Sequence, residues 1–242
     1  MLSNDYHRTA ARYAQRPQNV GTDSLVFRAL EVRLRELCLR GDALDVGCGT
    51  GRSTRFLQGF GLRTVGLDIS EAMLKEARRI DSSSEYHSYV DGTRFPFEND
   101  RFSLILSTWA VLELGTLESL RHFIKESSRV LNPDGTVFIA TNTPEFYSRR
   151  WVSCDVNFPE NNAPLQSGQQ VTALLLPEGV QVRDYFWTDL DYRSAFADAG
   201  LIVKDAFYPT ASANEEGWYD ETKIAPHVIY ELVKRRGSRL RG

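Results

Sequence analysis

The chain has 242 residues, 42% of them hydrophobic and 25% charged, a composition that suits one large domain with a substantial core. Its formal net charge of −3 argues against a broad electrostatic surface for nucleic acid, and no apolar run approaches the roughly 18 residues of a membrane span. Three widely spaced cysteines without a metal-binding pair, and first residues without the apolar core of a signal peptide, predict a cytoplasmic protein with no metal site.

Two helices are predicted before the first strand. A short amphipathic helix ends before Pro17, and apolar side chains at three- and four-residue spacing between Leu25 and Leu37 predict a longer one. Strands and helices then alternate: the predicted strands are 43–46, 64–68, 85–90, 102–108 and, after the turn "NPDG", 135–141, and the predicted helices are 51–60, 70–80 and 117–131. This alternation is typical of βαβ units, so we expect an α/β fold with a mostly parallel sheet and helices on both faces.

The alternation breaks between residues 142 and 187. This segment has no clear helix, but "QVTALLL" and "VQVRDYFW" flank "PEG" and predict a β-hairpin. The pattern resumes with a helix at 188–199 and strands at 201–208 and 227–234. We therefore expect 142–187 to be a cap inserted after the fifth strand of a single domain over 1–242.

A glycine-rich turn, "LDVGCGTG", follows the first predicted strand. Gly47, Gly49 and Gly51 allow the backbone to approach a ligand at the carboxyl end of that strand, where open α/β sheets bind ligands. A dinucleotide fingerprint requires a third glycine where this chain has Arg52, and the carboxylate of Asp45 would lie near a pyrophosphate. Both features weaken a NAD interpretation and favour a cofactor that carries positive charge.

Three aspartates strengthen this interpretation. Asp45, Asp68 and Asp91 recur at intervals of 23 residues, each at the predicted end of a strand. Asp68 suits a ribose diol, Asp91 an adenine amino group, and Asp45 an ammonium, either directly or through water. S-adenosylmethionine (SAM) offers these groups together. The alternative is that strand-end aspartates only cap the following helices.

Residues 43–141 resemble the SAM-binding half of a class I methyltransferase. "LDVGCGTG" resembles the first motif of that family, "GLDIS" its ribose-binding strand end, and "VDGTRFPFENDRFSLILS" its adenine loop and following strand, while "RVLNPDGTVFIAT" is similar to its late helix, turn and strand. The resemblance implies a Rossmann-like, seven-stranded sheet whose last strand, 227–234, is antiparallel. With the three aspartates, the cofactor-binding residues that it implies are Gly47, Gly49, Thr50, Gly51, Ile69, Met73, Gly92, Thr93 and Ser107.

The acceptor of the methyl group is harder to infer. The sulfonium is already a good leaving group, so transfer requires alignment and exclusion of water more than a dedicated catalytic residue. The Asn/Asp-Pro-Pro-aromatic run, frequent in relatives that methylate amide or exocyclic amino nitrogens, is missing from "STWAVLEL". A small organic acceptor, methylated on oxygen, nitrogen or carbon, is therefore favoured. An RNA or protein methyltransferase and a catalytically silent SAM-binding partner subunit remain alternatives, and the basic tail at 234–242 is either a solvated terminus or an RNA contact.

Three regions supply expected acceptor contacts. The N-terminal region 1–40, which the family uses as a lid, contributes aromatic side chains, the stretch after the fourth strand contributes others, and the inserted cap offers an aromatic wall with an arginine pair suited to a carboxylate or phosphate. The expected substrate-binding residues are Tyr6, Tyr13, Trp109, Arg149, Arg150, Trp151, Tyr185 and Trp187. His7 and Glu113 are weak candidates for a general base, whereas His87, His122 and His227 are expected to be structural or exposed. Alternatively, the aromatic side chains of the cap form a core or a homodimer contact.

Overall fold

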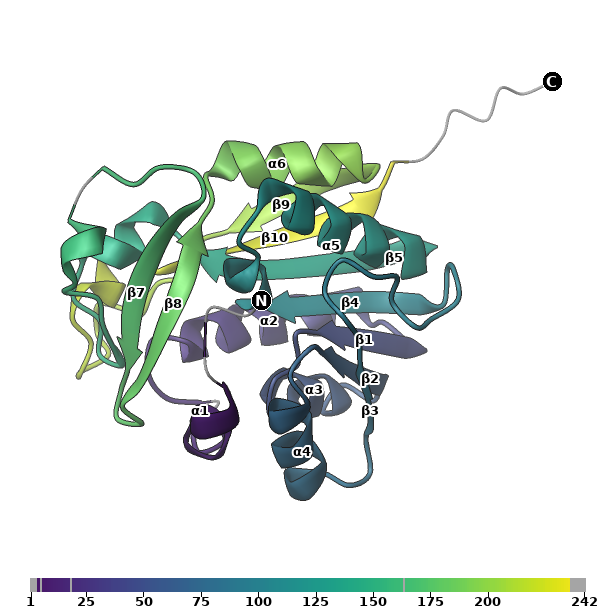
Figure 1. Cartoon of the computed structure of the whole chain (residues 1–242), viewed down its shortest axis with the longest axis horizontal. Helices are drawn as coiled ribbons and strands as arrows, with labels where there is room; N and C mark the ends of the chain where they lie inside the picture. Colours follow the sequence, from purple (N-terminus) through teal and green to yellow (C-terminus); the bar gives the residue numbers. More distant parts are fainter. Residues whose placement is uncertain (1–3, 5, 18, 163, 236–242) are drawn as a thin grey trace.

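The computed structural model describes residues 4, 6–17, 19–162 and 164–235, and it contains a seven-stranded sheet with a smaller sheet at one end (Figure 1). The large sheet comprises β1 (Asp42–Val46), β2 (Arg63–Asp68), β3 (Glu85–Ser88), β4 (Phe102–Thr108), β5 (Leu131–Asn142), β9 (Leu201–Phe207) and β10 (His227–Lys234). Its order is β3-β2-β1-β4-β5-β10-β9, with β10 antiparallel to both neighbours and the other pairs parallel. The predicted Rossmann-like sheet with an antiparallel last strand is confirmed.

Helices cover both faces of this sheet. They are α2 (Ser24–Leu37), α3 (Arg52–Gln58), α4 (Glu71–Ile80), α5 (Leu117–Val130) and α6 (Asp189–Asp198), while α1 (Tyr6–Tyr13) contacts α4 and β8 instead. Side chains alternate between the two faces along each strand. In β1, Leu44 and Val46 pack in the core beneath α5 and α6, whereas Ala43 packs against α2 and α3.

Two predicted boundaries shift. The third strand ends at Ser88 rather than at residue 90. The turn predicted at "NPDG" lies within β5 itself, because Phe102 of β4 pairs with Leu131 and Leu104 pairs with Thr136. Four residues therefore loop out of the register between two paired segments of the same strand.

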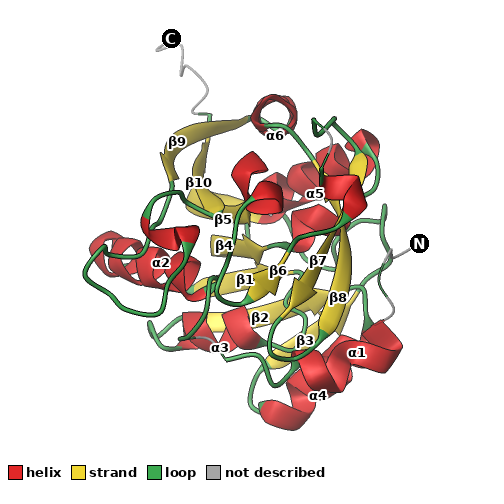
Figure 2. Cartoon of the chain, turned by 90° about the vertical axis from the view of Figure 1, so that its left-hand side faces the viewer, coloured by secondary structure: helices red, strands yellow, loops and turns green. Residues whose placement is uncertain are grey.

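The inserted segment forms a second, three-stranded sheet. It contains β6 (Cys154–Asp155), β7 (Gln169–Leu175) and β8 (Val180–Phe186), with η2 (Pro144–Ser148) and η3 (Pro159–Asn161) as short 3-10 turns. The predicted hairpin is confirmed as β7 and β8, which pair antiparallel. Figure 2 shows this small sheet in front of the ends of the central strands, with α1 beside it.

This small sheet has its own apolar core, in which η2 packs beneath β7 and β8. Because α1 and η1 (Ala110–Glu113) both contact β8, the insertion and the N-terminal helix lie over the same end of the large sheet. Among the described residues, no helix has the length and apolar character needed to cross a membrane.

Candidate functional site

The glycine turn after β1 depends on conformations that only glycine adopts readily. Gly47, Gly49 and Gly51 have φ of 74°, 52° and 78°, in the left-handed region. A Cβ atom at Gly47 would lie 2.1 Å from the Cβ of Ala110, and one at Gly51 would lie 2.4 Å from the Tyr86 hydroxyl. At Gly49 the nearest atom would be a ring carbon of Tyr13, 4.0 Å away. The turn is therefore closely packed at Gly47 and Gly51, whereas Gly49 has open space up to the ring of Tyr13.

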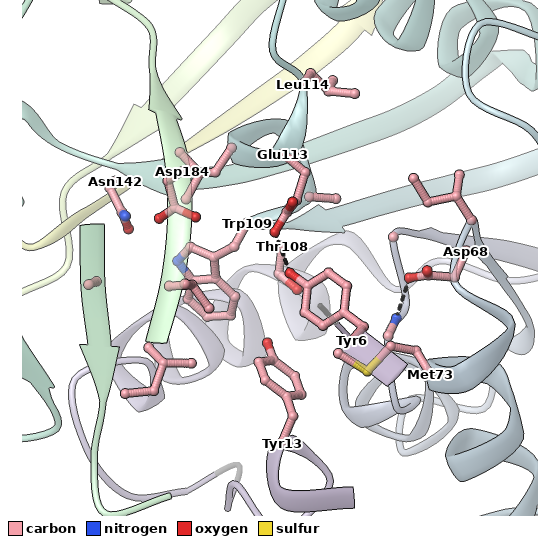
Figure 3. Close-up of a pocket in the computed structure, with 18 of the residues that line it drawn as sticks. Tyr6, Tyr13, Asp68, Met73, Thr108, Trp109, Glu113, Leu114, Asn142 and Asp184 are labelled. Carbon is pink, nitrogen blue, oxygen red and sulfur yellow. Dashed lines mark hydrogen bonds between the residues drawn. The ribbon is translucent and has the colours of Figure 1, made fainter. Parts of the chain in front are cut away.

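A cavity of about 410 Å³ lies between this turn, α1, η1 and the inserted sheet. Its volume is within the range of small-molecule sites, roughly 300–1,000 Å³. Of the predicted cofactor residues, it is lined by Gly47, Gly49, Asp68, Ile69, Met73 and Asp91. Figure 3 shows Asp68 and Met73 on one side of this cavity and Asn142 and Asp184 on the other. We call these two sides the cofactor half and the acceptor half.

Asp68 lies at the end of β2 in the cofactor half. Its Oδ2 accepts from the backbone N–H of Gly49 at 2.7 Å, and its Oδ1 accepts from the N–H of Ser70 at 2.8 Å. Burial raises the pKa of this carboxyl, and the backbone N–H groups oppose that change. A carboxylate has about four acceptor sites, so Asp68 retains capacity for a ribose diol.

Asp45 does not line the cavity, in contrast to the predicted contact with an ammonium. Because side chains alternate along β1, it shares the face of Ala43 and points toward α3, where its Oδ2 accepts from the hydroxyls of Ser53 and Thr54 at 2.7 Å each. Its Oδ1 is buried and has no hydrogen-bond partner in the described part of the chain, and burial raises its pKa to about 6. Asp45 therefore anchors the start of α3 through two side-chain hydroxyls, although it does not cap the backbone of that helix.

Four other predicted cofactor residues lie just outside the lining. Thr50, Gly92, Thr93 and Ser107 do not border the cavity, and neither does Gly51, whose space beneath the turn is filled by Tyr86. Their chain neighbours Tyr89, Val90 and Thr108 border it instead. Ser107 is fully buried, so the floor predicted at this residue is formed by the next one along β4.

Arg52 explains why the turn departs from a dinucleotide fingerprint. Its guanidinium is buried, lies 3.1 Å from Asp23, and stacks over the rings of Phe27 and Trp109 at 5.1 and 5.3 Å. Asp23 also pairs with Arg16 at 2.7 Å. Although burial opposes ionisation, these two cations hold the pKa of Asp23 well below its usual range.

The acceptor half contains three of the predicted aromatic contacts, Tyr6, Tyr13 and Trp109. The Tyr6 hydroxyl donates to Glu113 of η1, so the lid helix is connected to the stretch after β4 (Figure 3). Trp109 has φ of 60°, a conformation that is rare for a bulky side chain and is concentrated at functional sites. The side chain of His7 lies outside the described residues.

The other predicted acceptor contacts lie elsewhere. Arg149 is exposed and Arg150 stacks on Tyr219 at 4.6 Å, and neither lines the cavity, so the predicted anion site is wrong for this geometry. Trp151 is buried in the core of the small sheet, where its indole donates to the Phe146 carbonyl at 2.6 Å. Tyr185 and Trp187 pack around the chain that follows η1, Tyr185 against Gly115 and Trp187 by donating to the Leu114 carbonyl at 3.0 Å. The three aromatic side chains pack in the apolar cores of the small sheet and of the large sheet, which explains why they do not line the cavity.

Sequence reasoning missed a polar chain that crosses the acceptor half. His227 Nδ1 lies 2.9 Å from Asn142 Oδ1, Asn142 Nδ2 donates to the Tyr147 hydroxyl at 3.0 Å, and Tyr147 donates to Asp184. His227 and Asn142 are direct partners in the β10–β5 register. Because β10 is antiparallel, its first residue meets the last residue of β5. Polar residues at those two ends were the available signal.

The terminal groups of this chain have unusual protonation. Burial, reinforced by the charge of Glu113, raises the pKa of Asp184 well above its ordinary value despite the hydrogen bond from Tyr147. Burial also lowers the pKa of His227 to about 4, so its imidazole is neutral at physiological pH. No cluster in the described residues has the three or more His, Cys, Asp or Glu groups that could hold a metal ion.

Comparison with known proteins finds methyltransferases among the relatives of this chain. The profile of a family described as a methyltransferase domain matches residues 44–139. A malonyl-[acyl-carrier protein] O-methyltransferase of Enterobacter lignolyticus is 29% identical over 156 residues, which are 62% of this chain and 58% of that protein. Residues 44–139 therefore carry a methyltransferase domain. It spans less than two thirds of the length of this curated relative.

Solved methyltransferase structures share the fold. A chain of the complex between the Haloferax volcanii Trm112 methyltransferase activator and a methyltransferase superposes with a TM-score of 0.66, at 18% identity, over 98% of this chain and 100% of that one. The CcbJ methyltransferase of Streptomyces caelestis gives a TM-score of 0.67 at 15% identity, over 96% and 99% of the two chains. The cofactor half suits SAM, because Asp68, a buried carboxyl group that lines the cavity beside the glycine turn, favours a ligand that carries positive charge.

Proposed function

We propose that this methyltransferase transfers the methyl group of SAM to a small organic acceptor bound in the acceptor half. The observation that carries the proposal is one continuous cavity whose lining runs from Gly49 and Asp68 to Trp109 and Asp184. Its volume of about 410 Å³ suits small molecules rather than a folded partner.

When bound, SAM supplies a methyl group on a sulfonium, which is already a good leaving group. The chain then has to hold the two reactants in line and exclude water. In this proposal the glycine turn and Asp68 hold the cofactor, while Tyr6, Tyr13 and Trp109 cover the reacting centre with apolar rings.

The lid and the inserted cap act together in this proposal, as parts of one methyltransferase domain over 1–242. Arg16, three residues after the end of α1, pairs with Glu178 of the insertion at 2.8 Å as well as with Asp23. Both side chains of the Arg16–Glu178 pair are almost completely buried. Removing either segment is therefore expected to open the cavity to water.

The experiment that tests the proposal is calorimetric titration with S-adenosylhomocysteine and, separately, with NAD. We expect the homocysteine adduct to bind, NAD to give no heat, and Asp68→Ala to weaken binding by at least tenfold, because a carboxylate that holds the ribose is lost. Asp205→Ala is the matched control, since Asp205 is exposed on β9. Binding of NAD without the adduct would contradict the proposal.

A partner-dependent methyltransferase is the second candidate, because one structural neighbour is part of a complex with the Trm112 activator. An acceptor carried on RNA would also use the basic tail 234–242, of which 236–242 lies outside the described residues. Salt-dependent association with tRNA, lost on deleting 236–242, would support the RNA acceptor. Turnover that appears only with a copurified partner would support the partner-dependent form.

A further inference from the structure

Apolar side chains form most of the wall of the acceptor half. The inserted segment, through η2 and its three-stranded sheet, supplies Phe146, Cys154, Ala173, Leu175 and Val182. We call these side chains the apolar wall. Removing apolar surface from water is favourable, and small-molecule sites are usually lined in this way, with a few polar groups that fix the ligand. The acceptor half therefore favours a molecule with a large apolar part.

The cavity offers no counter-charge to an anion. Of the described residues that line it, none is lysine or arginine. Asp23 already pairs with Arg16 and Arg52, so those two cations are occupied. The imidazole of His227 is 1% exposed, and burial lowers its pKa to about 4, so it is uncharged at physiological pH. A carboxylate or phosphate acceptor would therefore be buried without a cation, which is costly.

Asp184 shares the cavity-facing side of β8 with Val182 of the apolar wall. It is 6% exposed, and no described cation forms an ion pair with it. Its titratable neighbours are a carboxylate and three phenols, Glu113, Tyr6, Tyr147 and Tyr192. Because a carboxylate is poorly solvated there, burial and the charge of Glu113 raise the pKa of Asp184 well above its ordinary value. Asp184 therefore holds its proton in the folded protein.

The proton of Asp184 has no hydrogen-bond acceptor in the described part of the chain. Asn142 Oδ1 lies 2.9 Å from His227 Nδ1, and Asn142 Nδ2 donates to the Tyr147 hydroxyl at 3.0 Å. Tyr147 in turn donates to Asp184, so this polar chain ends with Asp184 as an acceptor. A protonated carboxyl group also has one O–H to donate. Since Asp184 lines the cavity, that O–H is available to a ligand (Figure 3).

Building on the proposed methyl transfer, we propose that the acceptor is an uncharged molecule with a large apolar part, whose oxygen accepts a hydrogen bond from the Asp184 carboxyl group. The apolar part packs against the apolar wall. An unmade hydrogen bond in a buried site is costly, so Asp184 favours acceptors that carry such an oxygen. Asp184 thus determines specificity: its hydrogen bond orients the acceptor, while the methyl transfer itself takes no proton from it.

A charged acceptor of either sign has less support in this cavity. An ammonium ion would have to ionise Asp184 in a buried site, and the desolvation of both ions opposes that pairing. An anion would need Arg149 and Arg150, the cations that the sequence offered, and both lie outside the lining. The inference therefore replaces the charged group expected from the arginine pair with an uncharged oxygen.

Two sets of matched probes test the inference by NMR titration of protein saturated with S-adenosylhomocysteine, at about pH 6, where an ordinary carboxyl group is ionised. One set is 4-phenylbutan-2-one, 4-phenylbutan-2-amine and 3-phenylpropanoate, and the other is cyclohexyl methyl ketone, 1-cyclohexylethylamine and cyclohexanecarboxylate. Each set keeps the apolar part and changes the polar group from a ketone to an ammonium or a carboxylate. We expect the ketone to bind at least fivefold more tightly than its charged partners in at least one set.

Asp184→Asn separates a neutral donor from a carboxylate. The amide keeps an oxygen that accepts from Tyr147 and gives an N–H to the ligand, so it imitates the protonated acid. We expect ketone binding to stay within twofold of wild type in Asp184→Asn and to fall at least fivefold in Asp184→Ala, while binding of the adduct stays within twofold in both variants. Asp205→Asn and Asp205→Ala are the matched controls, since Asp205 is exposed on β9.

The protonation of Asp184 can also be measured without a probe, from its side-chain carboxyl ¹³C resonance, which is assigned by its absence in Asp184→Asn. We expect this resonance to have the shift of a protonated acid at about pH 6, and the shift of a carboxylate would overturn the inference. The absence of a ketone preference in both sets with the adduct bound, or equal losses in Asp184→Asn and Asp184→Ala, would also overturn it and leave the proposed function standing. Failure of the adduct itself to bind would count against the proposed function instead.

Discussion

The cofactor half and the acceptor half of the cavity are assembled differently. The cofactor half is assembled from short contiguous stretches, in which Gly47 and Gly49 follow β1, Asp68 ends β2 and Ile69 follows it. The acceptor half combines residues from the lid, η1, the end of β5, the inserted sheet and the start of β10. The cofactor half therefore follows from local sequence, whereas the acceptor half depends on tertiary register. The following predictions aim to separate the two halves.

Asp23→Asn is expected to have the largest effect, because this residue is the common partner of two buried arginines. The substitution leaves Arg16 and Arg52 buried without their common counter-charge. Breaking a buried ion pair in this way costs about 3–5 kcal/mol. Urea denaturation should report that loss in the free energy of unfolding, and a loss near zero would mean that Glu178 alone holds Arg16.

Gly47→Ala should damage the cofactor half selectively. The added Cβ would lie 2.1 Å from the Cβ of Ala110, in addition to the strain of a φ of 74°. Gly61→Ala is the matched control, since its φ is 75° and nothing lies within 4 Å of the added atom. We expect losses of roughly 2–4 kcal/mol for the first and about 1 kcal/mol for the second in thermal unfolding. Equal losses would show that the contact with Ala110 relaxes freely.

Asp45→Asn should change the pH dependence of stability. The folded-state pKa of Asp45, about 6, is above the ordinary value of about 3.9, so the folded state binds more protons than the unfolded state between these values. Its contribution to stability is therefore fully present below about pH 4 and is lost as the pH rises through 6. The variant should avoid that loss, of about 2–3 kcal/mol, while its amide oxygen still accepts from Ser53 and Thr54. Parallel curves for the variant and wild type across pH 4–7 would contradict the prediction.

Tyr147→Phe should have the smallest effect on stability and act only on the acceptor half. It removes the donor to Asp184 and the acceptor of Asn142, hydrogen bonds worth about 1 kcal/mol each. We expect the affinity for S-adenosylhomocysteine, measured by calorimetry, to remain within twofold of wild type. A tenfold loss would mean that the two halves are coupled through η2.

The sequence predicted the order of strands and helices and the hairpin at β7 and β8 because these follow from local periodicity and turn residues, whereas the antiparallel β10 was implied by the resemblance to class I methyltransferases. It missed the orientation of Asp45, since this depends on which face of β1 each side chain occupies. For the acceptor half, the pairing of His227 with Asn142 depends on the register between β10 and β5, which are 85 residues apart at this point. The adjacent Arg149 and Arg150 in the insertion suggested an anion site, whereas tertiary packing placed Arg150 on Tyr219.

The most direct test is to locate the transferable methyl group between the two halves. A ¹³C-edited nuclear Overhauser spectrum of the protein with [methyl-¹³C]SAM would detect ring protons close to that group. The account predicts cross-peaks from the methyl group to the rings of Trp109 and Tyr6, which lie between Asp68 and Asp184 in the cavity (Figure 3). A bound methyl resonance without cross-peaks to either ring would contradict it, because the methyl group would then not face the acceptor half.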